Sequence, residues 1–216
     1  MLLIISFLLF VQPAFHPQHG DLLFQDIDCG PLCDAIEEVT TGIDGAGFSH
    51  VGIVVETDSG TYVLEAISKG VVFTLLRIFL DRSTNSLGNP KVIVSRLKPE
   101  YSNLIPEAVD EMEKYVGKPY DTLFILGNDA YYCSELIYLG FKAANSNLDF
   151  FPLNSMTFKS PGTNTCYPVW KKYFTDMGVE VPEGKPGINP GAISRSGYLN
   201  VVHVYGKPDG YSGKFN

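Results

Sequence analysis

The sequence predicts an α+β domain, in which an antiparallel sheet of about five strands curls against one helix. The first observation is a hairpin pattern: Phe48 to Glu56 and Thr61 to Ala66 are rich in β-branched and aromatic residues, with turn residues between them. The second is a helical pattern that begins after Cys133. Its apolar positions are Leu136, Ile137, Gly140, Phe141 and Ala144. A hairpin-built sheet with helices packed on it is an α+β arrangement.

The composition suits one compact domain, expected over residues 20–208. The chain has 216 residues, of which 45% are hydrophobic and 19% charged, so a single core can be built. The formal charge of -8 argues against nucleic acid or an anionic membrane surface as the main partner. An acidic chain of this kind is compatible with neutral or cationic substrates.

The chain opens with a short apolar run that predicts a signal peptide over residues 1–15. Leu2 to Val11 contains one polar residue, Ser6, and is too short to span a bilayer but long enough for the apolar region of a signal. The alternative is a buried first strand. We therefore expect export to the periplasm or the exterior, no integral membrane span after signal removal, and a mature chain that begins after Ala14 and before Gly20.

The remaining regular elements follow from the same two periodicities. The expected strands are Gly20 to Phe24, Val71 to Ile78, Lys91 to Leu97 and Asn200 to Gly206, and the expected helices are Asp34 to Val39 and Leu104 to Tyr115. Residues 145–196 are rich in Pro, Gly and Asn and contain several aromatic residues. Long irregular segments often form binding loops, so this one is expected to line a cleft as an insertion. Lys171, Lys172 and Arg195 within it are expected to be solvated surface charges, with charges that line the cleft as the alternative.

Cys133 is the first candidate for chemistry. It lies in the first turn of the expected helix, where unpaired backbone N–H groups and the helix dipole favour an anion and therefore the reactive thiolate. Asn128 and Asp129 precede it and are expected to cap the helix. The alternative interpretation is a small core residue, because free cysteines are often buried.

His50 and Glu65 are expected to meet across the hairpin. If the loop runs from Glu56 to Ser59, His50 lies opposite Glu65; a shift of one pair would place Glu65 opposite Gly52, on the same face. A carboxylate bound to one ring nitrogen fixes the tautomer, and the other nitrogen can then take a proton from a thiol. The alternative for His50 alone is a hydrogen-bonded core histidine, and for Glu65 alone a solvent-facing strand residue. Together with Cys133, the two residues predict a nucleophilic site. His203 is interpreted as a packed strand histidine.

Neither a metal nor a cofactor is expected. Cys29, Cys33 and Cys166 are interpreted as buried or locally bridged cysteines, and one C-x3-C pair without a second ligand pair is a weak zinc signal. Zinc bound by Cys133, His50 and Glu65 is conceivable, but the paired ligand spacing that usually accompanies zinc is missing.

Three motifs together resemble a known family. They are Gly20-Asp-Leu-Leu-Phe24 with Phe48-Ser-His-Val-Gly-Ile53, then Val63-Leu-Glu-Ala66, and then Gly117-Lys-Pro-Tyr-Asp121 with Tyr132-Cys-Ser-Glu-Leu-Ile137. The chain resembles the circularly permuted papain-like cysteine hydrolases, the YiiX/YaeF-like branch of the NlpC-type amidases. In this branch the histidine strand precedes the cysteine helix, as it does here.

The resemblance implies a role for four residues. Cys133 would be the nucleophile, His50 the general base and then acid, and Glu65 the polar third member. Tyr120 would form an oxyanion hole with the backbone N–H of Cys133. Three further residues match the motif but are explained as well by a cap, a packing role and a surface role: Asp121, Tyr132 and Glu135, respectively.

The expected activity is hydrolysis of an amide through a thioester acyl-enzyme. The substrate would be a peptide, a cell-wall stem peptide or another N-acyl compound. The enzymatic alternatives are acyl transfer to an amine or lipid, and lipid amidase or thioesterase activity; the non-enzymatic alternative is a binding module of the same fold. Residues 145–196 have many turn residues and few apolar runs, which predicts an open, wet cleft and faster release of the acyl group to water than to amines.

Overall fold

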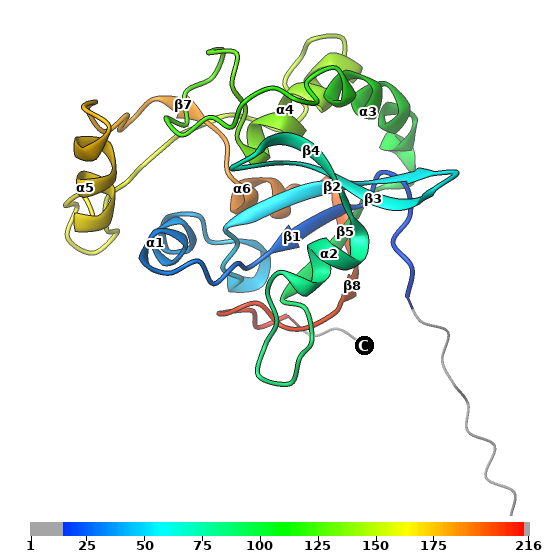
Figure 1. The fold of residues 1–216 in the computed structure, drawn as a ribbon, viewed down its shortest axis with the longest axis horizontal. Helices are drawn as coiled ribbons and strands as arrows, with labels where there is room; N and C mark the ends of the chain where they lie inside the picture. Colours follow the sequence, from blue (N-terminus) through cyan, green and yellow to red (C-terminus); the bar gives the residue numbers. More distant parts are fainter. Residues whose placement is uncertain (1–14, 214–216) are drawn as a thin grey trace, which may run out of the picture.

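A six-stranded antiparallel sheet forms the centre of the protein (Figure 1). The computed structural model describes residues 15–213, so most of the expected signal peptide lies outside the described residues. The sheet has the strand order β4-β3-β2-β1-β5-β8, one strand more than the five or so expected. Its strands are β1 (Leu22–Gln25), β2 (His50–Thr57), β3 (Gly60–Ile67), β4 (Gly70–Leu75), β5 (Val92–Leu97) and β8 (Leu199–Val204).

Helices cover both faces of this sheet (Figure 1). The helices are α1 (Pro31–Val39), α2 (Leu76–Asp81), α3 (Ile105–Glu113), α4 (Cys133–Ala144), α5 (Pro168–Asp176) and α6 (Pro190–Ser194). Two 3-10 turns, Ile43–Gly45 and Pro99–Leu104, and a two-stranded ribbon of β6 (Asn154–Ser155) and β7 (Pro186–Gly187) complete the described elements. The mixture of helices and antiparallel sheet confirms the predicted α+β fold. In the described part of the chain, no helix is long and apolar enough to cross a membrane.

Alternation along the strands divides the core in two. Phe24, Ile53 and Leu64 point to the face covered by α3 and α4, whereas Val54 and Val63 point to the face covered by α2. This is the period of two that strands impose on their side chains. Both faces are therefore buried, and the first turn of α4 is held against one of them.

Part of one expected strand is helical. Val71 to Ile78 was expected to be extended, but β4 ends at Leu75 and α2 begins at the next residue. Leu76 and Phe79 then pack on the apolar cluster of the sheet's second face. Packing of this short helix outweighs the β propensity of the local sequence.

Residues 145–196 do not form one irregular loop. They carry α5, α6 and the ribbon, and α5 packs on α1 at the left of Figure 1. Phe158, Trp170 and Phe174 form a separate apolar cluster there with Ala35 of α1. A disulfide joins Cys29 to Cys33 at the start of α1, whereas Cys133 and Cys166 are free thiols.

Candidate active site

Helix α4 begins at Cys133, with Tyr132 as its N-cap residue. Glu135 closes this end: its carboxylate accepts hydrogen bonds from the backbone N–H of Tyr132 and of Gly127, both at 3.4 Å. The expected surface role of Glu135 is wrong, because the residue is completely buried. Burial raises the pKa of Glu135 to about 8, against the lowering effect of these two hydrogen bonds. A buried carboxyl group therefore lies in the first turn of α4, two residues after the cysteine.

Asn128 and Asp129 do not cap the helix as expected. Asn128 accepts a hydrogen bond from the backbone N–H of Ala130, and Asp129 forms an ion pair with Lys118. Both interactions lie within the loop that leads to α4. The N-cap position is taken by Tyr132, which is extended and separates Asn128 and Asp129 from the first turn of the helix.

Glu65 contacts His50, the histidine that interacts with the cysteine. His50 Nε2 and Glu65 Oε2 are 2.6 Å apart, and both side chains are buried. The register in which His50 lies directly opposite Glu65 is wrong. The alternative, shifted by one pair so that Glu65 lies opposite Gly52, is the observed one, since Ile53 pairs with Leu64. The reason is the turn, in which only two residues separate the paired Thr57 and Gly60.

Glycine at position 52 makes room for this contact. A Cβ atom built on Gly52 would lie 3.3 Å from the Cβ atom of Glu65 and would collide with Val63. Without that side chain between them, the glutamate reaches along the sheet to His50, at the start of β2.

Two residues that the sequence did not indicate hold Glu65 from the other side. Arg82 donates from Nη1 to Oε2 at 2.8 Å and from Nη2 to Oε1 at 2.6 Å. The Thr74 hydroxyl donates to Oε1 at 2.5 Å. Arg82 directly follows α2, which was expected to begin as a strand, so no local pattern placed it here.

These contacts determine the protonation states of His50 and Glu65. Burial alone would lower the pKa of His50, but hydrogen bonds with Cys133 and Glu65 outweigh it and raise this pKa to about 9. Burial would raise the pKa of Glu65, but Arg82 and His50 lower it to about 2. At neutral pH an imidazolium therefore lies between a carboxylate and the cysteine. Because Nε2 is engaged by Glu65, the ring's other nitrogen, Nδ1, is the one left for the sulfur.

Cys133 opens into a cavity of about 240 Å³. Tyr120 lines the same cavity, and its phenolic oxygen makes no hydrogen bond with another described residue. Burial raises the pKa of Tyr120 well above its usual range, so the hydroxyl keeps its proton and can act as a donor. Residues 145–196 supply much of the remaining wall, including Met156, Phe158 and Trp170.

The other charged and titratable candidates lie in different places. Arg195 is exposed, as expected for a surface charge, and it also lines the cavity. Lys172 pairs with Asp176 on the exposed side of α5. His203 lies on β8, where its ring stacks on Phe15 with centroids 4.1 Å apart.

A cysteine at a helix start, beside a histidine and its carboxylate on an antiparallel sheet, is the arrangement of papain-like proteins. Here the histidine strand precedes the cysteine helix, so the order is permuted. The chain belongs to the family of permuted papain-like amidases, YaeF/YiiX, C92, whose family model matches residues 16–203. The family resemblance inferred from the motifs is therefore confirmed.

Individual relatives agree with this family. The chain is 34% identical to the uncharacterized protein YiiX of Escherichia coli (strain K12) over 140 residues, which span 63% of this chain and 64% of that protein. The crystal structure of the metalloprotein YiiX from Escherichia coli O157:H7 has the same fold, with a TM-score of 0.69 and 23% identity. The structural match covers 90% of this chain and 100% of the YiiX chain.

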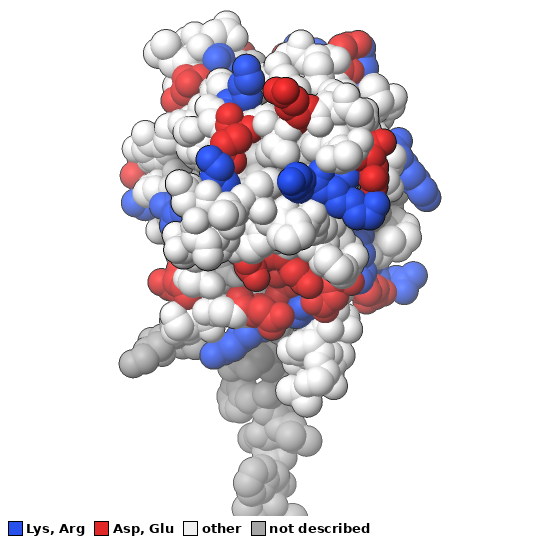
Figure 2. All heavy atoms as spheres, turned by 90° about the vertical axis from the view of Figure 1, so that its left-hand side faces the viewer, with Lys and Arg blue, Asp and Glu red and all other residues white. Residues whose placement is uncertain are grey.

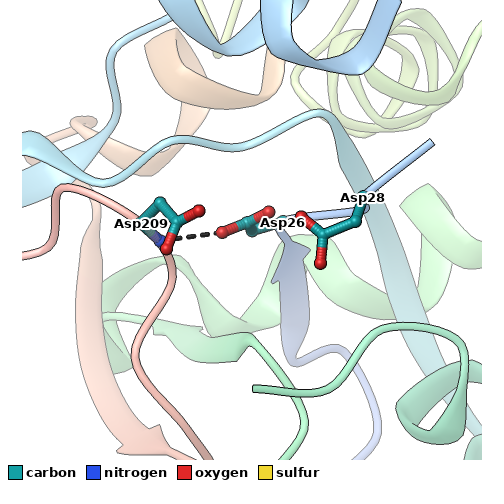
Figure 3. Close-up of side chains that lie close together, drawn as sticks. All are labelled: Asp26, Asp28 and Asp209. Atoms are coloured by element: carbon teal, nitrogen blue, oxygen red, sulfur yellow. Dashed lines mark hydrogen bonds between the residues drawn. The ribbon is translucent and has the colours of Figure 1, made fainter. Parts of the chain in front are cut away.

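Three carboxylates gather beyond the end of β1 in the described part of the chain. Asp26, Asp28 and Asp209 bring three carboxylate oxygens within 4.8 Å of one another (Figure 3). The ammonium of Lys91 lies 2.8 Å from Asp26, 2.7 Å from Asp28 and 3.8 Å from Asp209. Asp26 also accepts the backbone N–H of Asp209 at 2.7 Å. A metal would meet a positive charge already in place, so this cluster does not fit one.

The cysteine site fits a metal no better. Both oxygens of Glu65 are engaged by His50, Arg82 and Thr74, and His50 Nε2 is engaged by Glu65. The guanidinium of Arg82 would also repel a cation bound to that carboxylate.

Proposed function

We propose that this protein is a cysteine amidase that uses Cys133 as nucleophile and His50 as general base and acid. The observation that carries the proposal is the chain of contacts from Arg82 through the buried Glu65 to the buried His50, which ends at the thiol. Imidazolium beside sulfur favours the thiolate, the form that attacks a carbonyl. The membership in an amidase family supports the same reaction class.

The proposed reaction has two halves. The sulfur of Cys133 attacks the amide carbon, His50 gives its proton to the nitrogen as the C–N bond breaks, and a thioester remains. Water then attacks the thioester, His50 takes the proton from this water, and the C–S bond breaks to release the acid. Tyr120 and the backbone N–H of Cys133 would stabilise the oxyanion in both halves.

Acyl transfer is the second candidate, because the cavity wall favours it. Ile36, Val39, Phe124 and Phe158 give the cavity an apolar lining that suits an acyl chain. We expect water to remain the main acceptor. Product partitioning from an activated acyl donor, with and without amine or lipid acceptors, tests this: dominance of acylated acceptor, with free acid at background, would replace the hydrolase by a transferase.

Covalent labelling tests the nucleophile directly. The protein is incubated with activated esters and anilides and quenched in acid, and its intact mass is measured. We expect one acyl group on Cys133, its loss in Cys133→Ala, and its retention in Cys166→Ser, which removes the other free thiol. Full turnover by Cys133→Ala would reject the proposal, and an unlabelled but ligand-binding protein would favour a binding module.

We also propose that the protein is exported. The Cys29–Cys33 disulfide supports this location, because such bonds persist in oxidising compartments. Protein recovered from its own cell should begin after Ala14 and before Gly20; an intact Met1 on cytoplasmic protein would reject export.

A further inference from the structure

Arg195 lies between two cavities. One is the cavity of about 240 Å³ that contains Cys133, and the other, of about 350 Å³, adjoins it. Three residues line both: Asn154, Ile188 and Arg195. Arg195 is the one Lys, Arg, His, Asp or Glu among the described lining residues of the two cavities. A substrate held at the thiol and extending into the second cavity would pass this guanidinium.

The guanidinium of Arg195 has no ionic partner among the described residues, whereas two other cations of residues 145–196 do. Lys159 pairs with Glu183 and Lys172 with Asp176. Figure 2 shows the face that carries α1 and α5, where acidic side chains gather in a band low on the face and most Lys and Arg lie above it. Arg195 is thus a positive charge without an ionic partner among the described residues, in the cavity that contains Cys133, in a chain of formal charge -8.

The backbone that carries Arg195 is held firmly. The Asn189 side chain caps α6 by accepting the N–H of Ala192 at 2.7 Å, and Ser194 accepts the N–H of Ile43 at 3.0 Å. Just before α6, the carbonyl of Ile188 accepts the Ser134 hydroxyl at 3.0 Å, which joins this segment to the first turn of α4. The base of the arginine is therefore fixed relative to Cys133, while its side chain is exposed and can adjust to a ligand.

We propose that Arg195 is a specificity-determining residue that binds a carboxylate of the substrate, so that the enzyme prefers N-acyl amino acids or peptides with a free carboxylate near the scissile amide. A guanidinium matches a carboxylate at two points. A phosphate dianion would be only half neutralised, since no second cation lines either cavity among the described residues. The inference deepens the proposed amidase function and rests on it.

The first experiment compares an N-acyl amino acid with its carboxamide as substrates. Wild type should show the higher kcat/KM for the acid. Arg195→Gln should lower kcat/KM for the acid about tenfold, the usual effect of losing a charged hydrogen bond, and leave the carboxamide nearly unchanged. Arg195→Lys should keep part of the preference, and Lys172→Gln, which removes an exposed charge on α5, should keep all of it.

A second experiment does not need amide turnover. N-chloroacetyl-phenylalanine and its carboxamide alkylate a thiol with loss of chloride, and their rates are compared in a Cys166→Ser background. Arg195→Gln should lower the ratio of acid to carboxamide alkylation of Cys133. If both reagents slow equally, or neither does, Arg195 does not select a carboxylate. A changed ratio without amide cleavage would reject the amidase and keep the carboxylate site.

Discussion

Arg82 and Glu65 form a two-point ion pair behind His50, with nitrogen–oxygen distances of 2.6 and 2.8 Å. The carboxylate is fully buried, while the arginine side chain is 23% exposed. The arginine thus holds Glu65 ionised and orients it toward the imidazole. This makes Arg82 a positioning residue, because it acts on His50 through another side chain.

Arg82→Gln should therefore impair both stability and activity. The buried carboxylate loses a charged partner, which we expect to cost about 1–3 kcal/mol in the free energy of unfolding. Activity should fall further than stability explains, with a higher apparent pKa for Glu65 in the acid limb of the pH–rate profile. The measurements are denaturant unfolding and kcat/KM against pH. Arg77→Gln is the matched control, since its pair with Asp81 is exposed; an equal effect there would contradict the prediction.

The His50 pair should stabilise the fold in a defined pH range. The folded pKa of His50, about 9, exceeds the ordinary 6.5, so its contribution is complete below pH 6.5 and is lost as the pH rises through 9. The difference in unfolding free energy between wild type and His50→Gln should shrink between pH 5.5 and 9.5. Urea unfolding at both values measures this, and a difference that grows with pH would show that the imidazolium is not the stabilising form.

Glu135 should also make the fold less stable as the pH rises. Its folded pKa, about 8, lies above the ordinary 4.5, so it destabilises the fold progressively as the pH rises from 4.5 through 8. Relative to wild type, Glu135→Gln should gain on the order of 4 kcal/mol between pH 5 and 8.5. Unfolding of the exposed Glu113→Gln variant controls for the lost charge. An unchanged difference between wild type and Glu135→Gln would mean that the carboxyl titrates normally.

Gly191 brings α6 against the end of α1. A Cβ atom at this position would overlap the backbone carbonyl oxygen of Thr40, which cannot rotate away as a side chain could. Gly191→Ala should destabilise the protein by about 2 kcal/mol and displace the cavity wall, with a larger loss of activity. Gly162→Ala, where nothing lies within 4 Å, should change stability by less than about 0.5 kcal/mol. Equal behaviour of the two variants in denaturant unfolding would refute this reasoning.

The sequence predicted what local periodicity determines. Alternation located the β2–β3 hairpin and therefore the contact of His50 with Glu65, and helical spacing located the start of α4. The exact pairing was one step off because the turn length was not readable from the turn residues alone.

Long-range packing determines what the sequence did not predict. Arg82 reaches Glu65 only because α2 folds back on the sheet, and its own residues have strand propensity. Arg195 reaches the cavity because the segment before it is hydrogen-bonded to α4. This bond joins Ser134 and Ile188, which are 54 positions apart. Neither relation leaves a periodic pattern in the chain.

The order of elements has a consequence for how the protein acquires reactivity. His50, Glu65 and Arg82 lie within one run of neighbouring elements, 15 and 17 residues apart, whereas Cys133 comes from a helix much later in the chain. Contacts between residues close in sequence form faster than contacts between distant residues. We therefore expect the contacts among His50, Glu65 and Arg82 to form first. The thiol of Cys133 should become reactive only at the end of folding, when it reaches His50. During refolding of a Cys166→Ser protein, pulses of iodoacetamide at pH 6 should find slow alkylation until native tertiary structure appears. Rapid, His50-dependent alkylation before that point would show that the two halves assemble together.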